Sequence, residues 1–358
     1  MTQPDSSAAP SADAIEHAAR QLLAGGLAAF PTETVYGLGG DAENVDAVAS
    51  IYAAKGRPLN HPVIVHIAPE GDPAYWAADV PPEARKLMQA FWPGPLTLIL
   101  KRAAHIPSFV SGGQDSIGLR CPSHPVAQAL LRAFARGKPN GQGGVAAPSA
   151  NKFGQVSPTR AEHVRAEFPE QVAQGMPVLD GGAAEVGIES SIVDLSRLDR
   201  GVGPVMLRPG HVTAAQIAAV LGMPVGRPDT DAPRASGTLK AHYAPHTPLE
   251  LVDAARVSRA LQGRGLPAGK VALVAYDPRP AGSVPTEDDG RMHWHAVPAD
   301  PAQYAQALYA TLRELDTQGY ARILLQAPPL LPEWEAVNDR IGRAAAAFSL
   351  DTTGLTGT

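Results

Sequence analysis

The stretch Ala28–Ile67 reads AAFPTETVYGLGGDAENVDAVASIYAAKGRPLNHPVIVHI. Its two ends belong to short apolar runs, residues 27–30 and 63–67, whose composition predicts buried strands. Between these runs lie hydroxyl-bearing side chains, two tyrosines, four glycines and the cations Lys55 and Arg57. Hydroxyls and cations held between two rigid strands suit an anionic ligand, because they supply hydrogen-bond donors and opposite charge. The stretch therefore predicts one half of an anion-binding site.

The composition is typical of a soluble globular protein. The chain has 358 residues, of which 44% are hydrophobic and 18% charged, and two domains are expected at this length. The net charge of −5 argues against non-specific coating of nucleic acid but is compatible with a local basic groove. The single cysteine, Cys121, excludes an internal disulfide framework and a cysteine-based zinc site.

The chain carries no signal for a membrane or for secretion. No apolar run approaches the roughly 20 residues needed to cross a bilayer. The first residues, MTQPDSSAAPSAD, lack the basic-then-apolar order of a signal peptide. We expect a cytoplasmic protein with no membrane contact and a short disordered lead over residues 1–11.

Hydrophobic periodicity predicts a first domain over residues 12–222. Helices are expected at residues 15–23, 45–52, 83–91, 126–134 and 213–221, and strands at 27–30, 63–67, 96–101, 116–121, 178–179, 192–195 and 205–207. Another helix is expected after residue 157. Either Ser157 caps it with Pro158 at the first helical position, or Thr159 and Glu162 form a capping box. Strands outnumber helices and the connections are mixed, so we expect an α/β (α+β) fold around one twisted sheet.

The composition changes over residues 223–248, which hold five prolines and little apolar periodicity. A loop of this length is either a linker or a functional segment. Beyond it, strands are expected at 249–252, 270–276, 292–297 and 322–326, alternating with helices at 254–261, 302–315 and 334–347. This alternation predicts a small α/β domain over residues 249–350, a common domain size.

Several familiar catalytic motifs are absent. The sequence has no P-loop, no G-x-G-x-x-G after a strand, no G-x-S-x-G and no H-E-x-x-H. His242 and His246 are four residues apart, but Pro245 between them disrupts a helical pair, and we expect no metal site. Any phosphate must be held by a less familiar arrangement.

Lys55 and Arg57 stand at a helix-to-loop junction. Cations at such a place often only complement the helix dipole. Here Gly56 and Pro58 stiffen the segment, and a Lys point charge beside an Arg fork is suited to a polyphosphate. The pair is therefore a candidate triphosphate contact.

Polar residues also stand on other predicted strands or at their ends. Pro148–Asn151 (PSAN) ends an apolar strand, where α/β sheets place ligands, although an ordinary turn is the alternative. Ser116 and Arg120 are four residues apart and share one face of a strand. An Arg in an apolar strand is costly unless an anion pairs with it. Without a Ser/His/Asp triad or paired carboxylates, this pattern indicates binding of a triphosphate and a second anionic substrate, with catalysis by positioning and charge neutralisation.

The chain resembles the threonylcarbamoyl-AMP synthase family, with the YrdC-like fold, in its long two-domain form. The matching stretches follow the family's order over about residues 12–248 and read PTETVYGLG, KGRPLNHPVIVHI, FWPGPLTLIL, SIGLRCP, APSANKFGQVSPT, GIESSIVDL, VMLRPG and HYAP. The resemblance implies a YrdC-like twisted mixed sheet with flanking helices and a smaller, Rossmann-like C-terminal α/β domain. It also implies a nucleotidyltransferase that converts L-threonine, bicarbonate and ATP into threonylcarbamoyl-AMP and pyrophosphate, for the threonylcarbamoyladenosine modification of tRNA.

The resemblance further implies roles for individual residues. The threonine would be bound by Thr34, His66, Arg120, Ser149 and Ser191. ATP would be bound by Arg57, His61, Ser116, Asn151, Thr159 and Arg208, with His242 and Tyr243 closest to it in a lid formed by residues 223–248. Lys55 and Arg57 would be the catalytic cations, and Mg²⁺ would arrive with ATP.

The resemblance implies partners and a reaction path as well. The threonine amine would attack bicarbonate or the CO₂ derived from it, and the carbamate oxygen would then attack the α-phosphate. The product would pass to a tRNA-modifying threonylcarbamoyl transferase, and weak contact with tRNA itself fits the same groove. The alternative is a non-catalytic RNA-binding or ribosome-associated protein, although aromatics of 5% provide little for base stacking. The chain departs from the family at Glu33, where Asp is common, and in ASGTLKAHYAP, which lacks the frequent Pro-Gly pair.

Overall fold

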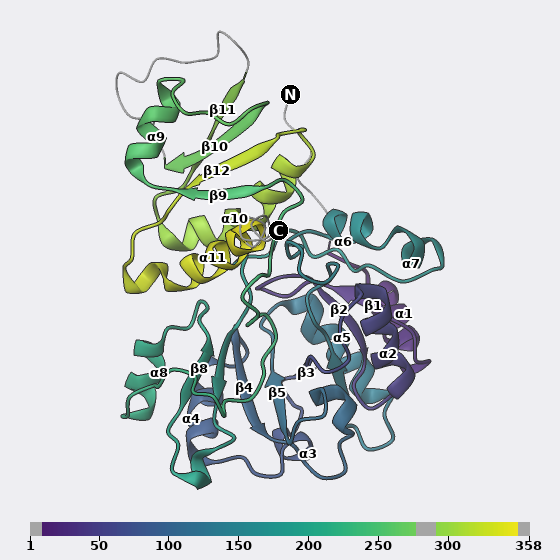
Figure 1. Ribbon diagram of the computed structural model, residues 1–358. Coiled ribbons are helices and arrows are strands. Elements are labelled where there is room, and N and C mark those ends of the chain that lie inside the picture. Colours follow the sequence, from purple (N-terminus) through teal and green to yellow (C-terminus); the bar gives the residue numbers. More distant parts are fainter. Residues whose placement is uncertain (1–8, 277–290, 350–358) are drawn as a thin grey trace, which may run out of the picture. The chain divides into compact units, whose positions relative to one another are not determined.

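The computed structural model describes residues 9–276 and 291–349 (Figure 1). The chain forms two compact units. The first contains the residues up to Phe153 together with Ser157–Thr238, and the second contains Gly154–Val156 and the residues from Leu239 onward. The boundary after Thr238 lies inside the 223–248 segment, so the first part of that segment belongs to one unit and the rest to the other.

The first unit is built on a mixed sheet of eight strands. Their order across the sheet is β1 (Ala28–Phe30), β2 (Gly37–Asp41), β6 (Gly144–Ala146), β3 (Ile64–Ile67), β5 (Ser116–Arg120), β4 (Leu96–Lys101), β7 (Ser191–Asp194) and β8 (Val205–Arg208). The pairs β3–β5 and β4–β7 are parallel and the other neighbours are antiparallel. This confirms the mixed α/β sheet expected from the sequence.

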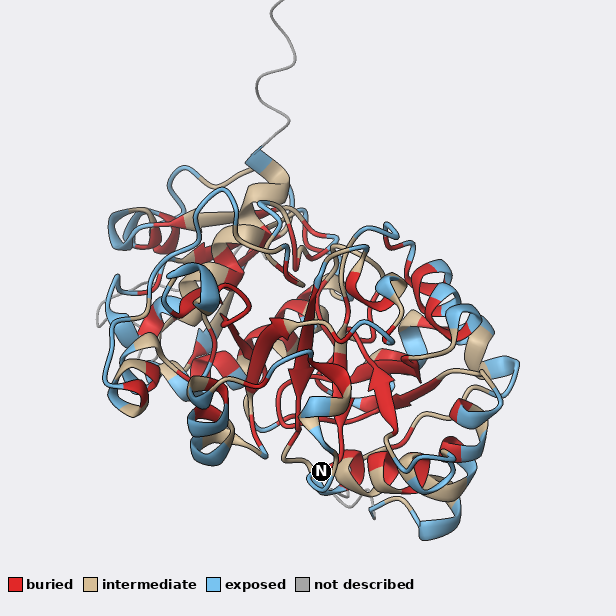
Figure 2. Cartoon of the chain, turned by 90° about the horizontal axis from the view of Figure 1, so that it is seen from below, coloured by how far each residue is buried: buried red, intermediate tan, exposed pale blue. Residues whose placement is uncertain are grey.

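Helices flank this sheet. They are α1 (Ala12–Leu23), α2 (Val45–Lys55), α3 (Pro73–Trp76), α4 (Pro82–Phe91), α5 (Pro125–Arg136), α6 (Ala161–Glu167), α7 (Pro169–Ala173) and α8 (Ala214–Leu221), with the 3₁₀ turns η1 (Ser108–Ser111) and η2 (Leu198–Arg200). Ser11, Asn44 and Thr213 cap the helices that follow them by accepting backbone N–H bonds, which satisfies donors that a helix start leaves unpaired. In Figure 2 most strands are red and many helices carry pale-blue outer turns, as expected of helices with one apolar face.

Strand β2 was not among the strands expected from the sequence. Its sequence, GLGGD, has low strand propensity, but a Cβ on Gly39 would lie 2.8 Å from Val145 Cγ1 and 2.9 Å from Phe30 Cε1. The glycine is required because neighbouring side chains fill the space above the strand. Close packing therefore overrides the local propensity.

Two other local expectations were wrong. Helix α6 begins at Ala161 with Arg160 at its cap, because Ser157 donates to Glu189 Oε1 (2.5 Å) and the Thr159 N–H donates to His163 Nδ1 (3.2 Å). Neither predicted cap forms: the Ser157 hydroxyl bonds to Glu189, and the helix begins one residue too late for Thr159 to be its cap. The strand predicted at residues 178–179 is reduced to a single bridge between Val178 and Ala29.

The second unit is a small parallel α/β domain, as expected. Its sheet has the order β11 (Met292–Val297), β10 (Val271–Tyr276), β12 (Arg322–Gln326) and β9 (Leu249–Val252). The helices are α9 (Ala254–Leu261), α10 (Pro301–Asp316) and α11 (Glu335–Ser349), with the 3₁₀ turn η4 (Pro332–Trp334). Within residues 9–276 and 291–349, no helix is both long and apolar enough to cross a membrane.

Candidate substrate-binding site

Strands β3 and β5 place a histidine beside an arginine. His66 and Arg120 are register partners in this parallel pair, so their side chains leave the sheet on the same face. The Phe30 ring packs edge-on against the His66 ring, with centroids 6.2 Å apart. The apolar ring excludes water from one side of the imidazole and so helps to bury it.

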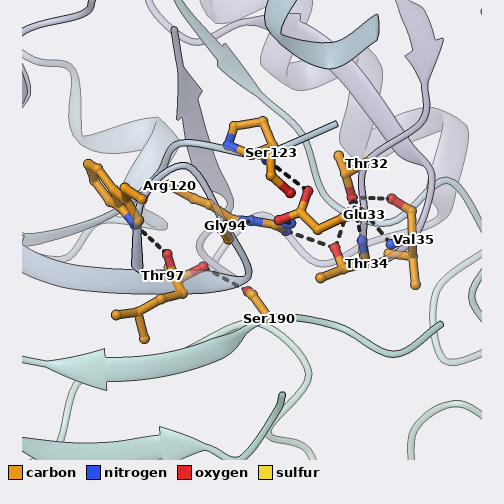
Figure 3. Close-up of polar contacts among 12 residues, drawn as sticks. Thr32, Glu33, Thr34, Val35, Gly94, Thr97, Arg120, Ser123 and Ser190 are labelled. Atoms are coloured by element: carbon orange, nitrogen blue, oxygen red, sulfur yellow. Dashed lines mark hydrogen bonds and ion pairs between the residues drawn. The ribbon is translucent and has the colours of Figure 1, made fainter. Parts of the chain in front are cut away.

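Three groups hold the Arg120 guanidinium (Figure 3). Its Nη1 donates to Thr34 Oγ1 (2.9 Å) and its Nη2 to Glu33 Oε1 (2.6 Å). Its Nε donates to the Gly94 carbonyl oxygen (3.3 Å). The anion expected beside this Arg is thus a carboxylate of the protein itself. Glu33 is absent from the site residues predicted from the sequence, although the cost of burying an unpaired Arg already indicated that some anion would be there.

The Thr34 hydroxyl oxygen has one lone pair left to accept a hydrogen bond from a ligand. Thr32 donates its only hydroxyl proton to the Val35 carbonyl oxygen (2.7 Å), so in the 2.8 Å contact between the two threonines Thr34 must be the donor. Thr34 Oγ1 also accepts from Arg120, which leaves one lone pair. A ligand at this oxygen must therefore offer an N–H or O–H group. Arg120 has two N–H groups beyond the three used and is suited to a carboxylate.

The His66 imidazole is uncharged at neutral pH. Burial, and next the Arg120 guanidinium, lower the pKa of His66 from 6.5 to about 3. Its Nδ1 lies 3.3 Å from the Ile64 carbonyl oxygen. The ring thus adds hydrogen-bonding groups to this cluster without adding charge.

This pKa predicts an acid sensitivity that depends on His66. The folded pKa lies below the unfolded value, so the unfolded chain binds the proton more readily and the stabilising effect, complete above pH 6.5, is lost as the pH falls towards 3. The loss is about 1.4 kcal/mol for each pH unit in that window. We expect His66→Gln to lose about 2 to 3 kcal/mol less unfolding free energy than the wild type between pH 7 and 4.5 in urea titrations.

The matched control for this measurement is His211→Gln. His211 is exposed, so its replacement removes one histidine without altering the buried cluster around His66. Equal slopes for His66→Gln and the wild type over this pH range would contradict the assigned role of burial.

Lys55 is buried beneath the PSAN turn. Its ammonium donates to the carbonyl oxygens of Ser149 (2.5 Å) and Asn151, so it fixes the backbone of this turn. Burial, and next the charge of Arg57, lower the pKa of Lys55 well below its usual value. An anion brought close to Lys55 would oppose this shift, so the site is electrostatically prepared for negative charge.

Arg57 and Arg208 converge on one residue of the 223–248 segment. Arg57 Nη2 donates to Ser236 Oγ (3.2 Å), and Arg208 Nη1 donates to the Ser236 carbonyl oxygen (2.8 Å). Arg57 Nη2 also donates to the Pro62 carbonyl oxygen (2.8 Å), while Arg208 Nε and Nη2 donate to the Ser190 carbonyl oxygen (3.0 and 2.9 Å). Two guanidinium groups thus lie within hydrogen-bond reach of the same position.

His61 lies beside this pair of arginines. The Phe153 ring meets the His61 ring edge-on (centroids 5.3 Å apart), and the Arg57 guanidinium lies 5.8 Å from the centre of the same Phe153 ring. Burial, and next the charge of Arg57, lower the pKa of His61. The Arg57 guanidinium is thus within the range of a cation–π interaction with the Phe153 ring, which also contacts His61.

Three predicted site residues make none of these side-chain contacts with the clusters. Ser116 is at the opposite end of β5 from Arg120, about 13 Å along the strand, where it lines a depression of about 660 Å³ with Lys101 and Arg102. Ser191 donates its hydroxyl to the Val212 carbonyl oxygen (2.6 Å). Thr159 Oγ1 is buried, and among the described residues it has no hydrogen-bond partner.

His242 and Tyr243 belong to the second unit, where α10 and α11 hold them. Tyr243 has a φ of +62°, stacks on Tyr309 (centroids 5.8 Å apart) and lies under the Arg340 guanidinium, 5.3 Å from the ring centre. The His242 N–H donates to the Arg343 carbonyl oxygen (3.2 Å). A left-handed conformation in a non-glycine residue persists only where surrounding contacts enforce it, so this part of the segment is firmly fixed.

The described part of the chain contains no cluster of three or more His, Cys, Asp or Glu side chains arranged to hold a metal ion.

The polar side chains described above for the first unit form two sets. One is the buried cluster of Glu33, Thr34, His66 and Arg120, and the other contains Lys55, Arg57 and Arg208 near the PSAN turn and Ser236.

Comparison with known protein families matches both units. Residues 20–210 match the family described as "Telomere recombination". Residues 212–346 match the family described as "Threonylcarbamoyl-AMP synthase, C-terminal domain".

Individual relatives agree with these matches. The chain is 38% identical over 247 residues to the threonylcarbamoyl-AMP synthase of Pyrococcus abyssi, covering 68% of each chain. It is 44% identical over 245 residues to that of Bacillus subtilis, covering 67% of this chain and 66% of the relative. The crystal structure of P. abyssi Sua5 complexed with L-threonine superimposes with a TM-score of 0.78 at 30% identity, covering 94% of this chain and 95% of the other.

Proposed function

The chain belongs to the threonylcarbamoyl-AMP synthase family in its two-domain form, and we propose that it converts L-threonine, bicarbonate and ATP into threonylcarbamoyl-AMP and pyrophosphate. The family and the nucleotidyltransferase class that were expected from the sequence are therefore both confirmed. The activated threonylcarbamoyl group serves the threonylcarbamoyladenosine modification of tRNA.

The observation that carries the proposal is the convergence of Arg57 and Arg208 on Ser236. Two guanidinium groups directed at one position can together donate hydrogen bonds to several oxygens of a polyphosphate. Lys55 adds a third cation beside the PSAN turn. We assign ATP binding to this set together with His61, Ser116, Asn151 and Thr159, and assign Lys55 and Arg57 the catalytic neutralisation of phosphate charge.

The buried cluster around Arg120 is the proposed amino-acid end. The two remaining N–H groups of Arg120 would bind the threonine carboxylate, and the free lone pair of Thr34 would accept from its ammonium or hydroxyl group. His66 would contribute as a neutral ring. Ser149 in the PSAN turn and Ser191 at the start of β7 complete the proposed set. The bound threonine would therefore reach from Arg120 to both of these residues.

The chemistry then needs no covalent enzyme intermediate. The threonine amine, once deprotonated, attacks bicarbonate or CO₂ and forms a carbamate, with loss of water in the bicarbonate case. The carbamate oxygen attacks the α-phosphorus of ATP, and the bond to the β-phosphate oxygen breaks to release pyrophosphate. The enzyme holds the reactants in line and stabilises the charge that develops on the departing pyrophosphate.

Mg²⁺ would enter on the nucleotide as part of the ATP substrate. Residues 12–222 would be the catalytic domain, 249–350 the C-terminal domain and 223–248 a lid, a role supported by the contacts of Ser236 with two arginines. His242 and Tyr243 would lie nearest the nucleotide. The product would pass to a tRNA-modifying threonylcarbamoyl transferase, with weak direct contact to tRNA.

A pyrophosphate-release assay with product detection by mass spectrometry tests this function. We expect release with ATP, L-threonine and bicarbonate present, and background release when any one of them is omitted. Threonylcarbamoyl-AMP should accumulate in proportion to pyrophosphate. Release that is independent of threonine or bicarbonate would refute the proposal, and tight tRNA binding without any turnover would instead favour a non-catalytic RNA-binding protein.

Thr34 provides a prediction about the amino-acid end. Thr34→Val removes the acceptor for Arg120 and for the ligand, so we expect the Kd for L-threonine to rise about tenfold or more. Thr34→Ser keeps the oxygen and should stay close to the wild type. Isothermal titration with L-threonine measures both variants, and equal affinities in the two would contradict the assignment.

A further inference from the structure

Glu33 is the acidic member of the buried cluster, and no substrate role assigned above includes it. Glu33 is 3% exposed and Arg120 is 4% exposed. Glu33 Oε1 accepts from Arg120 Nη2 (2.6 Å), and Oε2 accepts from the Ser123 N–H (3.1 Å), as Figure 3 shows. Each carboxylate oxygen therefore has its own fixed donor.

These contacts fix the position of the Arg120 guanidinium and balance its charge. The guanidinium is held at Nε by Gly94, at Nη1 by Thr34 and at Nη2 by Glu33, so its plane cannot rotate without breaking hydrogen bonds. A binding group is most effective when surrounding contacts lock its orientation before the ligand arrives. The carboxylate also cancels the guanidinium charge, which would otherwise be buried without a partner.

We propose that Glu33 is a positioning residue that fixes Arg120 and makes the amino-acid end electrically neutral, so that it prefers a zwitterion to an anion of the same shape. This inference rests on the proposed function, because it takes L-threonine as the ligand of Arg120. L-Threonine has no net charge, and 2,3-dihydroxybutanoate, in which a hydroxyl replaces the ammonium, carries one negative charge. His66 is uncharged and does not change this balance.

Glu33→Gln separates these effects from simple packing. Gln has nearly the same shape but only one acceptor oxygen, so it cannot serve both Arg120 and the Ser123 N–H. The cluster then gains a net positive charge. A unit charge a few ångströms from the ligand is worth about tenfold or more in relative affinity at a partly screened site.

Asp194 supplies the matched control. It is also buried, its Oδ2 accepts from Arg197 Nε (2.8 Å), and its Oδ1 accepts from the Ser196 N–H (2.8 Å). Asp194→Asn therefore breaks the same kind of buried pair in the same unit. It lies at the opposite end of β7 from Ser191, away from the Arg120 cluster.

The experiment measures the affinities of L-threonine and 2,3-dihydroxybutanoate by isothermal titration of the full chain, with ATP binding and melting temperature recorded in parallel. For Glu33→Gln we expect the preference for L-threonine over 2,3-dihydroxybutanoate to fall about tenfold or more, with ATP affinity near the wild-type value. Asp194→Asn should lower the melting temperature to a similar degree and leave the preference unchanged. Glu33→Asp keeps the charge one methylene shorter and should retain most of the preference, even if Glu33→Gln fails to fold.

The outcomes are distinguishable. A wild type that binds no L-threonine overturns the proposed function. A wild type that binds L-threonine while Glu33→Gln keeps its preference overturns the role of Glu33 alone. A Glu33→Asp variant that is folded but has lost the preference overturns the charge role, and the same loss in Asp194→Asn would assign the effect to general destabilisation.

Discussion

Arg57→Ala should lose nearly all turnover while the protein stays folded. The variant removes a guanidinium that converges with Arg208 on Ser236, so charge on the phosphates is no longer balanced as pyrophosphate departs. Removing one preorganised donor of this kind costs about 100-fold or more in kcat. Pyrophosphate release measures turnover, and circular dichroism with a thermal scan checks folding.

Two further variants sharpen this result. Arg57→Lys keeps the charge but loses the fork, so we expect an intermediate rate. Lys55→Met should be as inactive as Arg57→Ala and less stable, because the ammonium also holds the carbonyl oxygens of Ser149 and Asn151. Lys86→Ala, at an exposed position on α4, is the control and should behave like the wild type. Wild-type turnover in Arg57→Ala would refute the phosphate role.

Arg120→Met should abolish measurable binding of L-threonine and destabilise the protein. Binding is lost because the carboxylate contact disappears, and stability falls because Glu33 remains buried without its counter-charge. Removing one partner of a buried ion pair typically costs about 3 to 5 kcal/mol. Isothermal titration measures the first effect and urea unfolding the second.

A surface pair supplies the contrast. Arg132 on α5 pairs with Glu70, and the two side chains are 42% and 65% exposed. Arg132→Met should keep wild-type affinity and stability, since water screens such a pair. If Arg120→Met bound L-threonine as the wild type does, Arg120 could not be the carboxylate contact.

Much of the fold could be predicted from local patterns. The mostly apolar runs at residues 96–101 and 270–276 correspond to strands because apolar sequence suits a buried strand. Strand β2 escaped prediction, since the packing that requires Gly39 comes from Phe30 and Val145, and the latter is more than a hundred residues away. Local propensity contains no information about such a neighbour.

The site was predictable in its residue types and less so in its pairings. The sequence indicated an anion beside Arg120, but it could not tell a substrate carboxylate from Glu33, which is 87 residues distant. It likewise described residues 223–248 as a loop without indicating that Ser236 would meet Arg57 and Arg208. In both cases the missing information is the position of one strand end relative to another segment.

The sequence by itself determined the family, the two α/β units and the chemical character of the site, because motif order, apolar periodicity and charge are local properties of the chain. Only the tertiary structure decided how the polar groups are used. It showed that the Arg120 charge is balanced internally and that the Thr34 hydroxyl can only accept from a ligand. The stretch Ala28–Ile67 is accordingly half of an anion site that already contains one of its own anions, since the fold buries Glu33 where Arg120 must be paired.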